Sequence, residues 1–161
     1  MSLERTILLA VWAFVIILLG WLWFKSSRRD VILLFCAGQC FTWSASLLFV
    51  ELKWIENPIR EFSKATSANF TFNYVLYPTL NVIYSLKYPR NGTRFRKWLH
   101  IAKYPAAMTV FILIIAKYTR LIKLTSFTWY ELYLVTMISL FMVRKYYEWF
   151  RRSFPEALKE P

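Results

Sequence analysis

Polar side chains inside long apolar stretches are the places in this sequence where chemistry could occur. Four of them recur every four residues, which puts them along one face of a helix: Asn69, Asn73, Tyr77 and Asn81. Amide and phenol groups in that position can hydrogen-bond to neighbouring helices or line a hydrated cavity. Pro78 lies among them, lacks a backbone donor and can bend the helix. We favour interhelical hydrogen bonding, with a polar path as the alternative.

Two further residues complete the candidate polar site. Gln39 lies beside a face of small residues spaced four apart, Gly38, Thr42 and Ser46, which would let a second helix approach closely. Glu131 is an acid within an apolar run, and such acids are functional candidates by default. It falls only one turn into its predicted helix, so we do not expect it deep in a membrane.

The residue types that usually carry catalysis or bind metal lack partners here. Cys36 and Cys40 share a helix with neither a His nor an acid, and we interpret them as small packing residues. His100 is expected in a loop among cations, with no nearby acid and no second His. Phosphate-loop, zinc-protease and nucleophile-elbow motifs are missing. We therefore expect no catalytic residue, no metal and no cofactor, and we lean away from an enzyme.

Composition decides what surrounds these groups. Of 161 residues, 58% are hydrophobic and 20% aromatic, which exceeds what one soluble core would bury. The net charge of +12 comes from Lys and Arg at the ends of apolar runs rather than along one face. This placement argues against nucleic-acid binding and for a lipid bilayer as the partner.

The lengths of the apolar runs predict an all-α, polytopic integral membrane helical bundle. A hydrocarbon core of about 30 Å needs roughly 20 helical residues. Five stretches meet this measure within a single domain spanning residues 1–161: about 6–24, 31–50, 67–86, 103–120 and 124–143. No small-residue cleavage site follows the first run, so we expect that helix to be retained.

The distribution of cations predicts the orientation. With five transmembrane helices, fourteen Lys and Arg lie on one side and seven on the other, which places the N-terminus outside and the C-terminus inside. If the third stretch fails to insert, four helices remain and the counts become fifteen and six, again with the C-terminus inside. Three cations directly after the first helix, against one before it, favour the five-helix arrangement.

Two segments between the helices are expected to lie along the membrane surface. The stretch 54–64 has apolar residues at helical spacing, and Asn57 before Pro58 suits a helix start, so we predict an outer surface helix. On the cytoplasmic side, cations alternate with aromatic residues, a pattern typical of contact with anionic lipid headgroups. The residues predicted to make that contact are Arg94, Arg96, Lys97 and Trp98.

One region of the sequence resembles a known family. The run from Glu56 to Thr66, followed by Asn69-Phe70-Thr71-Phe72-Asn73 and Tyr77-Pro78-Thr79, is similar to an uncharacterised family of small multi-helix membrane proteins from endospore-forming Firmicutes. The resemblance implies a bacterial cytoplasmic membrane and supplies no activity. It also makes the region from Glu56 to Pro89 the first place to look for a site.

These patterns lead to an ordered set of functional hypotheses. The first is a non-enzymatic membrane or assembly protein that packs against itself, as a homo-oligomer, or against a membrane partner protein. The second is a small transporter or channel component with a polar path along the third helix. A membrane-embedded enzyme comes third. A cavity that reaches Asn73 and Asn81 would favour the second hypothesis, and a fully packed interface there would favour the first.

Overall fold

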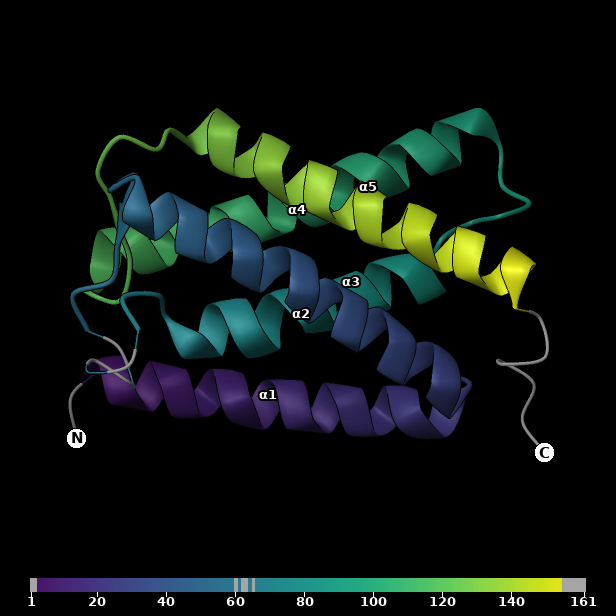
Figure 1. Cartoon of the computed structure of the whole chain (residues 1–161), viewed down its shortest axis with the longest axis horizontal. Helices are drawn as coiled ribbons and strands as arrows, with labels where there is room; N and C mark the ends of the chain where they lie inside the picture. Colours follow the sequence, from purple (N-terminus) through teal and green to yellow (C-terminus); the bar gives the residue numbers. More distant parts are fainter. Residues whose placement is uncertain (1–2, 60, 62–63, 65, 155–161) are drawn as a thin grey trace.

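The computed structural model describes residues 3–59, 61, 64 and 66–154, and this part of the chain is almost entirely helical. Its helices run back and forth along one long axis, and the first helix begins at the end of the bundle opposite to the one where the last helix ends (Figure 1). In chain order they are α1 (Leu3–Lys25), α2 (Arg28–Glu51), η1 (Thr71–Leu76) continuing into α3 (Tyr77–Leu86), α4 (Arg94–Tyr118) and α5 (Trp129–Ser153). Segment η1 is a π-helix.

Three of these helices, α1, α2 and α4, are long and apolar enough to cross a membrane. Helix α1 buries only four side chains in the bundle, Leu8, Val11, Val15 and Leu22. Large apolar side chains on its other faces stay exposed, among them Phe14, Ile16, Ile17, Trp21 and Phe24. A surface of this kind suits lipid rather than water. The prediction of an all-helical chain is confirmed, and three of the five predicted spans are long and apolar enough to cross a membrane.

The two remaining passes differ in length from the expected spans. Helical structure in η1 and α3 covers 16 residues, or about 24 Å at roughly 1.5 Å per residue, instead of the predicted 67–86. Helix α5 begins at Trp129 rather than near residue 124, because Thr128 and Glu131 form a capping box there. Glu131 therefore caps a helix, and α5 continues to Ser153, well past the predicted end. Helix α4 differs in the opposite way at its start: it begins at Arg94, well before the predicted residue 103.

Helix α2 ends in a motif that redirects the chain. Lys53 adopts a left-handed backbone with φ of 59°, and the amides of Lys53 and Trp54 donate to the carbonyls of Val50 and Phe49. This is a Schellman motif, and its usual apolar contact is made by the stacked rings of Phe49 and Trp54. The chain then enters a strand, so the predicted surface helix over 54–64 is wrong for the described residues of that segment.

Two loops meet at this end of the bundle. Strand β1 (Ile55–Glu56) pairs antiparallel with β2 (Lys123–Leu124), and Trp54 O accepts the amides of Thr125 and Ser126. Lys123 Nζ also lies 2.9 Å from a carboxylate oxygen of Glu56. The loops after α2 and after α4 therefore lie on the same side of the molecule.

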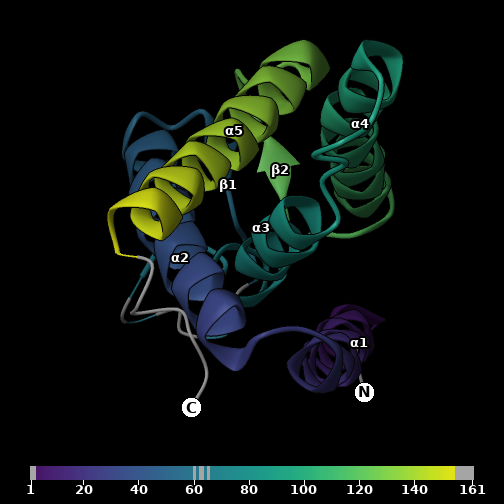
Figure 2. The same cartoon turned by 90° about the vertical axis from the view of Figure 1, so that its right-hand side faces the viewer.

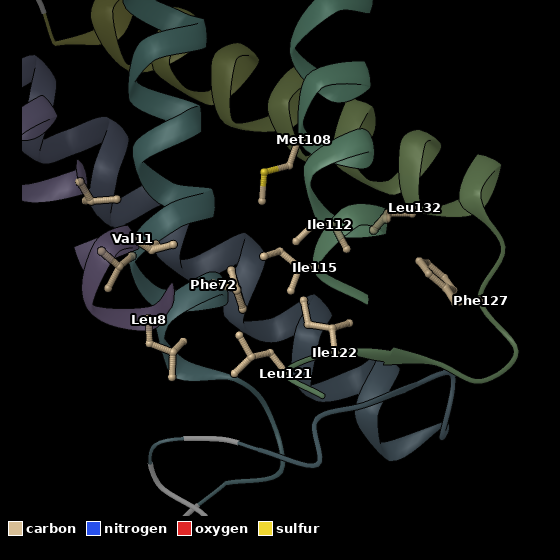
Figure 3. Packing of buried hydrophobic residues seen from close by; sticks show 12 residues of the cluster. Leu8, Val11, Phe72, Met108, Ile112, Ile115, Leu121, Ile122, Phe127 and Leu132 are labelled. Carbon is tan, nitrogen blue, oxygen red and sulfur yellow. The ribbon is translucent and has the colours of Figure 1, made fainter. Parts of the chain in front are cut away.

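Buried apolar residues form two clusters along the bundle. The larger lies next to the paired loops and joins α1, η1, α4 and α5 through residues such as Val11, Phe72, Ile112 and Leu132 (Figure 3). The smaller lies nearer the other end and includes Leu22, Leu34, Val82, Val143 and Tyr147. Viewed along the bundle, α1 lies beside α3 and apart from α5 (Figure 2). Helix α2 makes the closest approach to α3, at Gly38.

Replacing Gly38 by alanine should destabilise the bundle. A Cβ at position 38 would lie 3.1 Å from the Cα of Pro78 and 3.2 Å from the side chain of Asn81, so α2 and α3 would have to move apart. Overpacking of this kind costs about 1–3 kcal/mol. Thermal unfolding in detergent should show a lower midpoint for Gly38→Ala. Gly20→Ala is the matched control, since nothing lies within 4 Å of its Cβ position, and an equal loss in both variants would contradict the proposed close contact.

Candidate functional site

The centre of the candidate site is a proline in the third pass. Pro78 has no N–H, so residue 78 supplies no donor to either of the two carbonyls of the preceding turn that it could otherwise serve. These are Asn73 O, five residues earlier in the π-helical register, and Tyr74 O, four residues earlier in the α-helical register. Without water in a membrane, such carbonyls need partners from a neighbouring helix.

Helix α2 supplies those partners. Thr42 Oγ1 lies 2.9 Å from Asn73 O, and Gln39 Nε2 donates to Tyr74 O at 3.1 Å. The Thr42 hydroxyl also lies 2.8 Å from Gly38 O, so its proton is shared between two carbonyls. Gly38, Thr42 and Ser46 are all buried on α2, on the face where Gly38 approaches Pro78. The small face and the proline thus form one interface.

The asparagines use their side chains differently from what the sequence predicts. Asn73 Nδ2 donates to Asn69 O, and Asn81 Nδ2 donates to Tyr77 O, both four residues back in the same segment. Asn69 Oδ1 accepts the Phe72 amide in a similarly local bond. The Tyr77 side chain instead forms a hydrogen bond with Thr136 of another helix, α5. In the described residues, backbone carbonyls rather than asparagine amides accept the bonds from α2.

The start of η1 is fixed by an acid from the preceding loop. The carboxylate of Glu61 accepts the amides of Phe70 and Thr71, at 3.2 and 3.1 Å, and also the hydroxyl of Thr71. Trp12 Nε1 of α1 donates to that same hydroxyl at 2.9 Å. A carboxylate at a helix N-terminus accepts hydrogen bonds from the free amides and interacts favourably with the positive end of the helix dipole. Glu61 therefore links the loop, η1 and α1.

A cavity of about 80 Å³ lies beside η1, at the end closed by the paired loops. Asn69, Asn73 and Tyr77 line it, whereas Asn81 does not and packs against Gly38 instead. Its other polar walls come from Thr42 and Ser46 of α2, Thr136 and Ser139 of α5 and Asn57 of the loop after β1. Its apolar walls include Phe49, Phe72, Ile112, Leu124 and Phe127. The cavity thus occupies part of the polar stripe rather than its full length.

Two polar atoms of the cavity walls have no hydrogen-bond partner in the described structure. They are Asn69 Nδ2, on a residue that is fully buried, and Ser139 Oγ. An unpaired buried polar group costs about 1–3 kcal/mol, so both atoms are available to a molecule in the cavity.

A second polar cluster lies near the opposite end of the bundle. Arg144 of α5 is buried, with its guanidinium 2.8 Å from Ser85 O and 2.6 Å from a carboxylate oxygen of Glu148. The same group lies over the ring of Tyr88, 3.6 Å from its centroid. These contacts satisfy the charge within the protein, so the cluster joins α5 to α3 rather than presenting a free cation.

His100 belongs to the same region. It was expected in a loop, but it is buried on α4, where its Nε2 lies 2.9 Å from Tyr84 O. Its ring contacts those of Tyr84, Tyr88 and Tyr104, with centroids 4.7–5.3 Å apart. The residue packs α4 against α3, and no group of three or more His, Cys, Asp or Glu that could hold a metal occurs among the described residues.

Other residues singled out in the sequence lie at the surface. Cys36 and Cys40, which the sequence analysis interprets as packing residues, are exposed. Arg94, Arg96, Lys97 and Trp98 form the first turns of α4, which begins at an N-cap where Thr93 accepts the Arg96 amide. Trp98 is 71% exposed and the neighbouring Phe95 is 75% exposed, which suits a headgroup region.

Several residues of the two sites were missed from the sequence. Arg144 lies just beyond the predicted fifth span, which ends at residue 143, although a buried stripe of Leu132, Thr136, Leu140, Val143 and Tyr147 continues through it at helical spacing. That stripe is a signal that could have extended α5. Glu61 carries no such signal because it lies in a loop and caps a separate helical segment, and Ser139 carries none because its place in the cavity wall depends on how the helices pack.

Comparison of the chain with models of protein families, with curated proteins and with solved structures finds no match. The resemblance to a family from Firmicutes therefore stays a prediction.

Thr42→Val should destabilise the protein by about 1 kcal/mol, because Asn73 O loses its donor. In a Pro78→Ala background the cost should fall, since the new N–H at position 78 can serve the same carbonyl. A double-mutant cycle of unfolding free energies in detergent measures this coupling. Thr109→Val is the control, because the buried Thr109 hydroxyl has no partner to lose. Equal costs of Thr42→Val in both backgrounds would show that the proline does not create the need for Thr42.

Proposed function

We propose that this chain is a non-enzymatic, five-helix protein of a bacterial cytoplasmic membrane that acts by helix packing, with itself or with a membrane partner. The observation that carries the proposal is the use of its intramembrane polar groups. Thr42, Gln39 and the carbonyls around Pro78 are engaged in joining α2 to η1. Groups that are consumed in packing are poorly placed for proton transfer or ion coordination.

The pairing of the two loops supports five crossings. Strands β1 and β2 lie at one end, while α4 begins at the other end and is apolar enough to span. If α4 crosses, the chain must return between residues 56 and 94, and η1 with α3 is the segment that does so. Local thinning of the bilayer can accommodate a pass shorter than about 30 Å. With the cation count, this supports an outer N-terminus and an inner C-terminus.

The proposed inner face favours anionic lipids. The exposed start of α4 carries Arg94, Arg96 and Lys97 together with two exposed aromatic rings. Cations near an anionic surface contribute about 1 kcal/mol each, and aromatic rings prefer the headgroup level. The surrounding bilayer is therefore part of the proposed assembly.

The alternative is a small transporter or channel component, and one observation favours it. The cavity reaches Asn69, Asn73 and Tyr77, which are polar residues of the third pass. A path would have to continue past Asn81, but there α2 and α3 are in close contact through Gly38. The geometry therefore fits packing better than conduction.

Topology is tested with single cysteines in a Cys36→Ala, Cys40→Ala background. Ser67→Cys and Ser126→Cys, in the two loops that meet, should both react with a membrane-impermeant thiol reagent added to intact cells. Ser153→Cys should react only after the cells are broken. Opposite accessibility of positions 67 and 126 would contradict the loop pairing, and labelling of both only in broken cells would invert the proposed orientation.

Packing and conduction are separated by flux through proteoliposomes. If the protein acts by packing, vesicles that contain it should admit glycerol or urea no faster than protein-free vesicles, measured by stopped-flow light scattering. Asn73→Leu should then lower the unfolding midpoint without changing permeability. A fast flux that Asn73→Leu abolishes, with the unfolding midpoint unchanged, would overturn the packing proposal in favour of transport.

A further inference from the structure

We propose that the cavity beside η1 binds a small neutral molecule that has an apolar body and a carbonyl or hydroxyl oxygen. The oxygen would accept a hydrogen bond from Asn69 Nδ2, and the body would lie against Phe72, Ile112 and Phe127. Nothing in the packing function requires such a site, so this inference goes beyond it.

The polar atoms of the cavity walls favour a ligand that has a hydrogen-bond acceptor. Asn69 is fully buried and its Oδ1 is occupied by the Phe72 amide, which fixes the orientation of the side chain. Its Nδ2 is left without a partner, and an amide nitrogen can only donate. Ser139 Oγ, also unpartnered and able to donate or accept, comes from the opposite helix α5.

The other lining residues favour a ligand that is neutral and mostly apolar. Among the described residues, no Asp, Glu, Lys or Arg lines the cavity, and a charged ligand would remain unpaired by them at a high cost. Most of the walls are apolar or aromatic side chains with a few polar atoms, which is the usual character of a small-molecule site. A volume of about 80 Å³ suits a ligand of only a few non-hydrogen atoms.

The backbone beside the cavity is also unusual. Phe72 and Asn73 line it from within the π-helical segment, and π-helical turns occur frequently at functional sites. Register and capping there are held by Glu61 and by Thr42, from two different parts of the chain. The loops joined by β1 and β2 supply Ile55, Asn57 and Leu124 to the wall, so the site lies next to these loops.

Binding is tested on the purified full chain in detergent by ligand-observed saturation-transfer NMR. The probe is butan-2-one, and its shape analogue 2-methylbut-1-ene has a methylene group in place of the oxygen. Butan-2-one should bind with a dissociation constant on the order of millimolar, given its size. The alkene should bind about tenfold more weakly, because Asn69 Nδ2 would stay unpaired.

Variants of the walls identify the site. Ser139→Leu should fill the cavity and abolish the signal above detergent background, and Ala45→Leu does the same from α2 if the first variant fails to fold. Asn69→Ser keeps an N-cap oxygen for the Phe72 amide and removes the amide donor, so it should weaken butan-2-one about tenfold and leave the alkene unchanged. Thr109→Ala removes a buried unpartnered hydroxyl elsewhere and should change neither.

Two results would overturn the proposal. Equal signals from the wild-type protein and the filled variants would mean that the cavity holds water only and that the probe binds the micelle. Equal affinities for ketone and alkene would mean that Asn69 does not select the ligand. Neither result bears on crossing number or packing, which the cysteine and flux experiments test separately.

Discussion

The missing N–H of Pro78 is the constraint on which most of this structure depends. Residue 78 can donate neither to Asn73 O nor to Tyr74 O, which precede it by five and four residues. Thr42 and Gln39 of α2 satisfy both carbonyls, and Gly38 lets the two backbones come close enough for them to do so. The small face of α2, the π-helical turn and the proline are therefore three parts of one contact.

That contact also determines where the cavity can form. A π-helical turn is wider than an α-helical turn, and its residues Phe72 and Asn73 lie between α2 and α5 without filling the space. Farther along, α3 packs directly on Gly38, and the cavity does not reach Asn81. A cavity therefore lies beside η1, before Pro78, whereas α3, after Pro78, packs closely against α2.

The two ends of the bundle are stabilised in different ways. At one end, β1 and β2 pair, Glu61 caps η1 and the rings of Phe49, Trp54 and Phe127 stack together. At the other end, Arg144 reaches from α5 to Ser85 O, while His100 joins α4 to Tyr84. Both ends place polar groups between helices rather than toward lipid, as expected where each unpaired group is costly.

The sequence by itself predicted an all-helical chain with helices long and apolar enough to cross a membrane, because length, hydropathy and helical spacing are local properties. It also marked Asn69, Asn73, Tyr77 and Pro78 as unusual. Only the tertiary structure decided what they do, since the partners of the Pro78 turn on α2 lie 31 and 35 residues away from the carbonyls that they serve. The strand at 55–56, the caps that delay the starts of η1 and α5, and the burial of Arg144 were likewise beyond local reasoning. Each depends on hydrogen bonds between segments that become neighbours only after the chain has folded.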